Sequence, residues 1–211
     1  DGVTQQGTFV DMWNKAATDG GTVKLLKDVT ADSDGAFGTG VGFGDGNRNG
    51  YVGKKGYLLV PESINITLNL NGCTLNRALY SSSASERDAI IGGEVIEVKG
   101  ELTINDDKGN GIIKGGIGTL AGCILVEGTL KMNGGNITEN AVFDTAIGAV
   151  TILPAATFEM NGGSITGNDC NSSNNAGGVF VYPSANFKVS GNVNVTENGS
   201  RNVYLDNDEG R

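Results

Sequence analysis

The sequence predicts an all-β fold, namely a right-handed parallel β-helix whose stacked rungs each take about 28 residues. Three observations predict it: a motif that recurs at nearly constant spacing, short apolar stretches that alternate with period two, and an unusual composition. Glycine accounts for 35 of the 211 residues and proline for only 3, so glycine is at about twice its usual share of roughly 7%. Such a composition suits many short strands joined by tight turns that need a positive φ.

The repeat is clearest in the second half of the chain, where residues 130–140, 158–168 and 187–198 superpose. The first two share the pattern Met-Asn-Gly-Gly-x-Ile-Thr-x-Asn, and the third is a looser copy. These copies start 28 and 29 residues apart, and the same opening occurs earlier at Leu102 and at Leu68. Because no helical pattern separates the copies, a stack of strands is favoured over alternating strands and helices.

Each copy predicts three short strands, and the period-two alternation assigns their inward and outward faces. No rung could bury its apolar face alone, so stacking is required. The asparagines at 140, 168 and 198 fall at turns and are expected to be structural, bonding neighbouring backbone groups or one another. The expected inward columns are Leu68/Leu102/Leu130/Phe158/Phe187, Leu70/Ile104/Met132/Met160/Val189, Ile96/Ile124/Val150/Val179 and Val98/Val126/Ile152/Val181.

The two ends of the predicted stack differ. Residues 8–17 predict an amphipathic helix with Thr8 as N-cap, which would cover the first rung as the caps of repeat proteins do. No similar cap is predicted at the C-terminal end, so we expect further domains of the same polypeptide, or a partner, to follow there. We expect one β-helix domain over residues 1–211, with a helical cap (1–20), a Gly-rich loop insertion (31–56) and regular rungs (57–211).

Charge and hydropathy exclude several classes of partner. The net charge is −9, from 24 acidic and 15 basic residues without a basic cluster, which argues against nucleic acid and anionic membrane surfaces. No stretch approaches the roughly 20 apolar residues that cross a bilayer, so membrane insertion is not expected. The spacing of Cys73, Cys123 and Cys170 matches no zinc motif and favours buried structural thiols, with a Cys73–Cys123 disulfide left open.

A calcium site is one hypothesis for the Gly-rich insertion. Asp45, Asn47 and Asn49, followed by Gly50, place oxygen ligands as at the start of an EF-hand loop. The twelfth position is Gly56, where such a loop has a bidentate Glu. The alternative is that this segment is an ordinary turn that binds no metal. Calcium is therefore a possible cofactor of the chain, and no other cofactor is expected.

An aromatic group predicts a ligand-binding surface in the later rungs. The outward column of the second strand consists of Glu97, Leu125, Thr151, Phe180 and Tyr204, and Tyr182 lies two residues beyond Phe180. An exposed group formed by Phe180, Tyr182 and Tyr204 would be a platform on which sugar rings could stack. In the alternative, residues 169–176 fold over these rings and bury them.

Residues 21–30, residues 66–75 and the repeated Met-Asn-Gly-Gly motif resemble the pectate-lyase-like β-helix modules of adhesin-like surface proteins from Gram-positive gut and rumen anaerobes. The resemblance covers nearly the whole chain and implies a secreted or cell-surface location. The superfamily mixes lyases, hydrolases, epimerases and non-catalytic proteins, so the fold does not decide the activity.

Catalytic residues of that superfamily are not evident here. Its polygalacturonases use a Gly-His-Gly motif, whereas this chain has no histidine. Its pectate lyases combine an acidic calcium cluster with an Arg or Lys base, but none of Arg77, Arg87 and Arg201 shares a rung column with two or more carboxylates. We therefore expect a non-catalytic extracellular binding or adhesion module for a polysaccharide or glycan. A calcium-dependent polysaccharide lyase, or a fragment of one, and a purely structural spacer are the alternatives.

Overall fold

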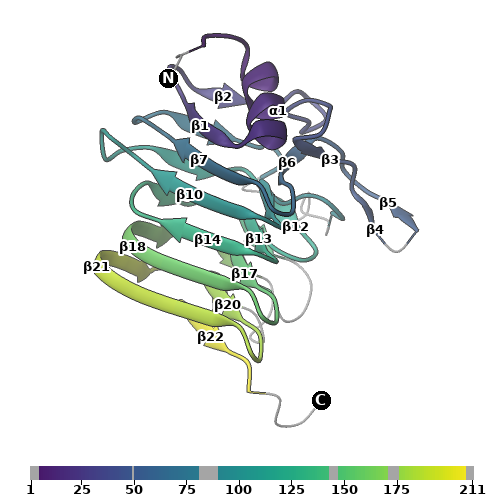
Figure 1. The fold of residues 1–211 in the computed structure, drawn as a ribbon. Helices are drawn as coiled ribbons and strands as arrows, with labels where there is room; N and C mark the ends of the chain where they lie inside the picture. The colour runs from purple at the N-terminus through teal and green to yellow at the C-terminus, as the bar shows by residue number, and fades with distance from the viewer. Residues whose placement is uncertain (1–4, 49, 81–89, 143–146, 171–175, 208–211) are drawn as a thin grey trace.

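Parallel strands stacked in layers form most of the molecule (Figure 1). The computed structural model describes residues 5–48, 50–80, 90–142, 147–170 and 176–207. Within these residues α1 (Phe9–Asp19) is the only α-helix, and it lies at the N-terminal end of the stack. The predicted class, an all-β fold of stacked parallel strands with an N-terminal helix, is confirmed.

The largest sheet has ten strands in the order β1-β7-β10-β14-β18-β15-β11-β8-β2, with β21 paired to β18. Strand β18 pairs with both β14 and β15, so this long strand joins two halves of the sheet. The strands are β1 (Gly21–Lys24), β2 (Val29–Thr30), β7 (Asn65–Asn69), β8 (Thr74–Asn76), β10 (Glu101–Asn105), β11 (Ile112–Lys114), β14 (Thr129–Met132), β15 (Asn136–Ile137), β18 (Thr157–Thr166) and β21 (Asn186–Thr196).

A second sheet of seven strands has the order β22-β20-β17-β13-β9-β6-β3. Its strands are β3 (Phe43–Gly44), β6 (Tyr57–Val60), β9 (Ile96–Val98), β13 (Ile124–Val126), β17 (Val150–Ile152), β20 (Val179–Val181) and β22 (Val203–Leu205). A third, three-stranded sheet consists of β12 (Ile117–Gly118), β16 (Ala141–Val142) and β19 (Asp169–Cys170).

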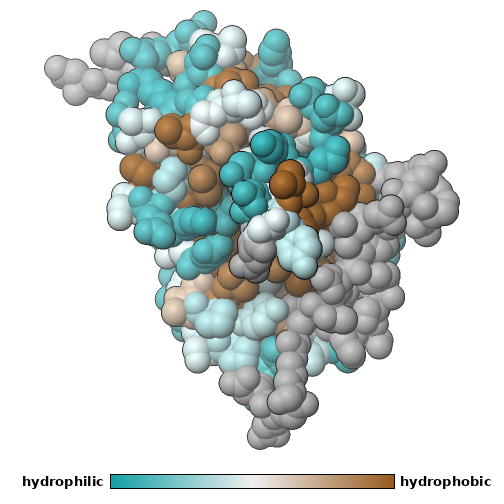
Figure 2. Space-filling view, turned by 90° about the vertical axis from the view of Figure 1, so that its right-hand side faces the viewer, coloured by the Kyte–Doolittle hydropathy of each residue, from teal (hydrophilic) through white to brown (hydrophobic). Residues whose placement is uncertain are grey.

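A hairpin of β4 (Asn47–Arg48) and β5 (Tyr51–Val52) projects from the side of the stack (Figure 1). Figure 2 looks onto this side, where hydrophilic and hydrophobic residues are mixed. The hairpin lies inside the segment 31–56 that the sequence predicts as a Gly-rich loop. That segment also contributes β3, which pairs antiparallel with β6.

Apart from Val189, which is 54% exposed, the predicted inward residues form one continuous apolar core or pack against it, and the predicted register is correct for most of them. Leu102 pairs with Leu130, Leu130 with Phe158, and Phe158 with Phe187. The prediction is wrong for β7, where Ile66 pairs with Leu102 and Leu68 with Ile104. A shift by two residues leaves the same side chains facing inward, so alternation alone does not distinguish the two registers.

The N-terminal cap is confirmed, with slightly different bounds. The Thr8 hydroxyl accepts a hydrogen bond from the Asp11 N–H, as an N-cap should. The helix continues to Asp19, two residues further than predicted, and ends at Gly20, whose φ of 74° favours glycine. Trp13 is fully buried, and its Nε1 donates to the Gly42 carbonyl over 2.8 Å. Strand pairing within the stack already includes β1, which pairs with β7.

The asparagine column at the turns is structural, as predicted. Asn140, Asn168 and Asn198 are almost fully buried. Nδ2 of Asn140 donates to Oδ1 of Asn168, and Nδ2 of Asn168 donates to Oδ1 of Asn198, each over 2.9 Å. Each amide also binds backbone carbonyls of its own or the preceding layer. The column therefore ties successive layers together.

Candidate functional site

The outward column of the second sheet has the predicted register but not the predicted exposure. Glu97, Leu125, Thr151, Phe180 and Tyr204 are aligned on successive strands. The first four are buried, with exposed fractions of 3, 0, 0 and 0%. The prediction that Phe180 is an exposed ligand contact is therefore wrong, and this face of the sheet is covered over most of its length.

The cover comes from segments of the chain that connect the sheets. Ala176 packs against the Phe180 ring, and the Thr151 hydroxyl accepts a hydrogen bond from the Gly148 N–H over 3.0 Å. The alternative in which residues 169–176 fold over the aromatic rings is therefore supported at Ala176. Residues 171–175 lie outside the described part of the chain. The third sheet and the segments next to it carry further buried apolar residues that are separate from the main core, namely Ile117, Ala121, Ala141, Val142 and Ile147.

The three predicted aromatic residues do come together. The rings of Phe180 and Tyr204 stack with centroids 4.9 Å apart and planes 15° apart, and Tyr182 lies 5.0 Å from Phe180 at 57°. Tyr182 and Tyr204 are half-buried. Phe180 thus supports the two tyrosines from beneath, and only the tyrosines reach the surface.

Arg201 completes this cluster, and sequence reasoning missed it as a site residue. Its guanidinium carbon lies 4.5 Å from the centre of the Tyr204 ring. Because Phe180 occupies one face of that ring, Arg201 lies over the other, in the geometry of a cation–π contact. The side chain is exposed, so its N–H donors remain accessible on top of the stack. In the sequence, Arg201 could have been associated with the cluster because it lies three residues before Tyr204, in the turn that precedes β22.

Two of the proposed calcium ligands, Asp45 and Asn47, lie at the base of the projecting hairpin. Oδ1 of Asp45 accepts a hydrogen bond from the Asn47 N–H over 2.9 Å, the geometry of an Asx turn that starts β4. Asp45 and Asn47 are both exposed, and Asn49 lies outside the described residues. Among the described residues no group of three or more Asp, Glu, Cys or His side chains is placed to hold a metal ion. The calcium site stays a prediction.

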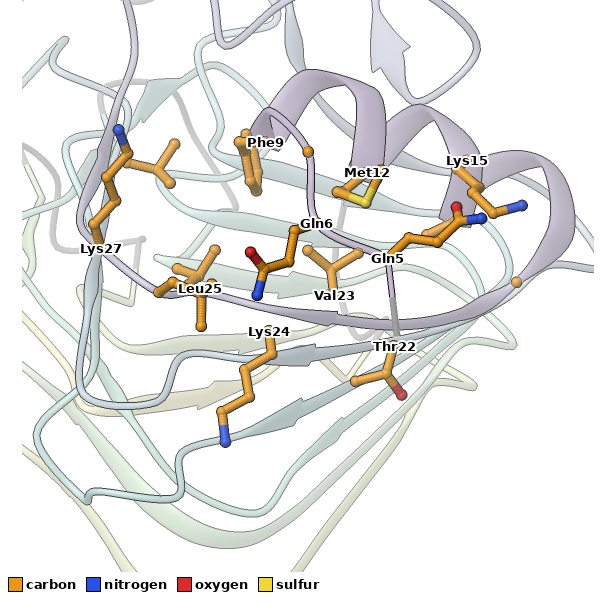
Figure 3. Close-up of a pocket in the computed structure, with 15 residues that line it drawn as sticks. Gln5, Gln6, Phe9, Met12, Lys15, Thr22, Val23, Lys24, Leu25 and Lys27 are labelled. Carbon is orange, nitrogen blue, oxygen red and sulfur yellow. The ribbon is translucent and has the colours of Figure 1, made fainter. Parts of the chain in front are cut away.

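A groove of about 800 Å³ lies between α1 and the first strands (Figure 3). Phe9, Met12, Val23 and Leu25 give it an apolar lining. Three lysines also line it, and two of them form ion pairs of 2.7 Å on the surface, Lys15 with Asp19 and Lys24 with Asp107.

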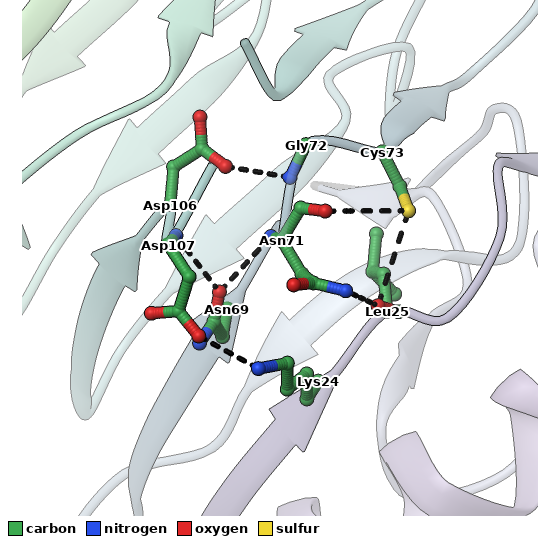
Figure 4. Close-up of polar contacts among 8 residues, drawn as sticks. All are labelled: Lys24, Leu25, Asn69, Asn71, Gly72, Cys73, Asp106 and Asp107. Atoms are coloured by element: carbon green, nitrogen blue, oxygen red, sulfur yellow. Dashed lines mark hydrogen bonds and ion pairs between the residues drawn. The ribbon is translucent and has the colours of Figure 1, made fainter. Parts of the chain in front are cut away.

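Polar residues at the turns beside this end form a dense network (Figure 4). The Asp106 carboxylate accepts hydrogen bonds of 2.6 Å from the N–H groups of Gly72 and Gly111. Asn69 accepts from the N–H groups of Asn71 and Asp107. The hydrogen bond from Lys24 lowers the pKa of the Asp107 carboxyl below its usual value. These contacts join turns of neighbouring layers, so the network holds the fold together.

Arg77, one candidate base of a lyase, is fully buried. Its Nη2 donates to the carbonyls of Lys55 and Gly92 over 3.2 and 3.1 Å, and its guanidinium lies within 6 Å of the Phe37 and Tyr57 rings. Burial lowers the pKa of Arg77 to about 10, against the opposing effect of the Glu94 charge. A side chain packed in this way supports the fold beneath the Gly-rich segment. Arg87, the other candidate in this half of the chain, lies outside the described residues.

The three cysteines are free thiols, so the Cys73–Cys123 disulfide left open by the sequence is not formed. Cys123 is fully buried, and burial raises the pKa of its thiol well above the usual value. Cys73 and Cys170 are half-buried. No helix in the described part of the chain is long and apolar enough to cross a membrane.

Comparison of the chain with protein-family models, with curated proteins and with solved structures found no match.

Proposed function

We propose that this chain is a non-catalytic binding or adhesion module of the right-handed parallel β-helix type, with rungs of about 28 residues. In this proposal it is related to the pectate-lyase-like modules of bacterial surface proteins and acts in a secreted or cell-surface protein. Its ligand is a polysaccharide or glycan.

The surface formed by Tyr182, Tyr204 and Arg201 is the observation that carries the proposal. Two half-buried tyrosines lie beside a fully buried phenylalanine, and an exposed guanidinium lies over one of them. Aromatic rings with one accessible edge supply apolar contact area, and a planar guanidinium supplies several fixed hydrogen-bond donors. Hydroxyl-rich sugars offer apolar ring faces and many acceptors, which suits both components.

Retention on immobilised polysaccharides tests the proposed surface directly. The wild-type chain should be retarded in affinity gels that contain pectin, cellulose or xylan, or bind a member of a glycan array. Tyr182→Ala combined with Tyr204→Ala, and separately Arg201→Ala, should abolish or strongly weaken that retention. Tyr51→Ala is the matched control, because Tyr51 is 67% exposed and lies in the hairpin away from the cluster.

Each alternative function has its own outcome in these experiments. Binding that persists in the double tyrosine variant removes the site from the proposal. A chain that binds none of the glycans supports the structural spacer. Release of ultraviolet-absorbing unsaturated uronates from polygalacturonate in the presence of calcium would contradict the non-catalytic assignment and support the lyase.

A further inference from the structure

Arg201 and Asn202 lie on a turn that is fixed to the preceding layer of the stack. The N–H of Gly178 donates to the Arg201 carbonyl over 3.3 Å, and the N–H of Val179 donates to the Asn202 carbonyl over 2.9 Å. Oδ1 of Asn202 accepts from the N–H of Asn198, a member of the buried asparagine column, over 3.1 Å. The backbone that carries the Arg201 side chain is therefore held in place by the layer beneath it.

The ring of Tyr204 supports Arg201 and does not itself offer a face to a sugar. Phe180 stacks on one face of this ring with centroids 4.9 Å apart, and the guanidinium carbon of Arg201 lies 4.5 Å from its centre, over the other face. Successive strands of a sheet are separated by a similar distance. Arg201 thus takes the place over Tyr204 that a side chain of one more layer would otherwise take, and the outward column ends in a guanidinium of this chain.

Within the part of the chain that the structure describes, the Arg201 side chain has no partner of opposite charge. The side chain is exposed, and its contact is with the Tyr204 ring. Lysines on the large sheet differ from it, since Lys131 is paired with Glu101 at 2.9 Å and Lys188 with Glu159 at 3.0 Å. The N–H donors of Arg201 and its positive charge are therefore available to a ligand.

A guanidinium in this position favours a carboxylate over a neutral group. It is planar and presents its N–H donors as a fork, from which a carboxylate accepts two in parallel. The hydroxyl groups of a neutral sugar can accept the same donors one at a time, but these hydrogen bonds lack the opposite charge and are weaker. The strongest contact that this surface can make with a glycan is therefore a bidentate one to a carboxylate.

We infer that the glycan bound at this surface carries carboxylates, as uronic and sialic acids do, and that Arg201 selects them through a bidentate contact. Tyr204 is a positioning residue that holds the guanidinium from beneath. Tyr182, at 5.0 Å from Phe180, supplies the apolar contact to an adjoining sugar ring. This inference rests on the proposed glycan binding and names the class of ligand.

Isothermal titration calorimetry on the full chain tests the selection. The probes are alginate and polysialic acid, which separate uronate from sialate as the source, each compared with the same polymer after reduction of its carboxylates to alcohols. At least one native polymer should bind, and its reduced form should bind at least about tenfold more weakly, because a charged hydrogen-bonded contact is lost.

The outcomes separate this inference from the proposed function. Equal binding of a native polymer and its reduced form, or binding to neutral glycans alone, overturns the inference and leaves a glycan-binding module. A chain that binds no glycan overturns both.

Substitutions of Arg201 test whether this residue makes the selection. Arg201→Ala should remove the preference for the native polymer. Arg201→Lys, which keeps the charge but loses the planar fork, should recover only a small part of it. Lys108→Ala is the matched control, because it removes one exposed positive charge from a turn outside this surface, and it should bind as the wild type does. A preference that persists in Arg201→Ala, or returns fully in Arg201→Lys, overturns the bidentate contact.

Tyr204→Leu tests the positioning role. Without the ring beneath the guanidinium, binding of the native polymer should weaken while binding of the reduced polymer stays the same. Tyr204→Phe keeps the ring and should restore what Tyr204→Leu loses. Equal weakening of both polymers in Tyr204→Leu would mean that Tyr204 contacts the sugar itself, which contradicts the positioning role. Circular dichroism and thermal unfolding show whether each variant still folds.

Discussion

Replacing Asn168 by alanine should destabilise the fold far more than a similar change at an exposed asparagine of the same layer. Asn168 is 2% exposed. Its Nδ2 donates to the carbonyls of Ile137 and Thr166 and to Oδ1 of Asn198, at 3.0, 3.3 and 2.9 Å. Its Oδ1 accepts from the backbone N–H and the side-chain amide of Asn140, at 3.2 and 2.9 Å. Truncation removes all five contacts.

The size of the destabilisation depends on whether the groups that bonded to Asn168 keep another hydrogen-bond partner. Nδ2 of Asn140 keeps its bond to the Thr138 carbonyl, but the buried N–H of Asn140 loses its acceptor, which costs about 1–3 kcal/mol. With the loss of the other bonds, Asn168→Ala should lower the free energy of unfolding by about 2–4 kcal/mol. For a chain of this length that corresponds to a fall in Tm of roughly 5–15 °C.

The control is Asn161→Ala. Asn161 is exposed and makes the same kind of amide contact, from its Nδ2 to Oδ1 of Asn133 over 3.1 Å. Water can replace that contact, so the cost should stay within about 1 kcal/mol. Thermal and denaturant unfolding followed by circular dichroism measure both variants. Equal losses in the free energy of unfolding at the two positions would refute the argument that the contribution of the inner asparagine column to stability depends on its burial.

Three further predictions concern the cap, a buried charge and the thiols. Thr8→Ala should cost about 1 kcal/mol through the lost N-cap bond to Asp11, and fluorescence of the single tryptophan, Trp13, should report detachment of the helix at lower denaturant. Arg77→Met should cost about 3–5 kcal/mol, because it removes one member of a buried, electrostatically coupled pair. Above pH 10 the folded chain loses the Arg77 proton while the unfolded chain keeps it, so the free energy of unfolding of the wild type rises with pH relative to the variant. A pH series of denaturant titrations on both proteins measures this difference. In a native thiol titration Cys123 should not react, and it should become reactive only on unfolding, because it is fully buried and its pKa is raised.

The sequence pattern was sufficient to predict the structural features that depend on residues close together in the sequence or on the repeat. The Thr8 cap and the structural asparagine column at the turns were predicted because each needs particular residue types at fixed positions. The pairing of Leu102, Leu130 and Phe158 was predicted because their spacing is nearly constant. Register failed at β7, before Leu102, where the spacing changes and two registers bury the same residues.

Exposure was the property that the sequence could not supply. Phe180 has the alternation of an outward residue and the register expected of it, yet it is fully buried. Its cover includes Ala176, which belongs to a connecting segment without a repeated pattern. Whether such a segment lies over a sheet or projects into solvent depends on tertiary packing. Period-two alternation predicts which face of the sheet a side chain is on, but not whether another segment covers that face. The same limit explains why Arg201, in a turn, was not chosen with the aromatic residues.

Connecting segments cover the outward column of the second sheet from Glu97 on β9 to Phe180 on β20, and Tyr204 on β22 is again half-buried. The proposed binding surface therefore lies where this cover ends, beside Arg201. Because Val189 lies on β21, outside this surface, Val189→Lys should leave glycan retention unchanged. Loss of retention in Val189→Lys would mean that the ligand also contacts β21.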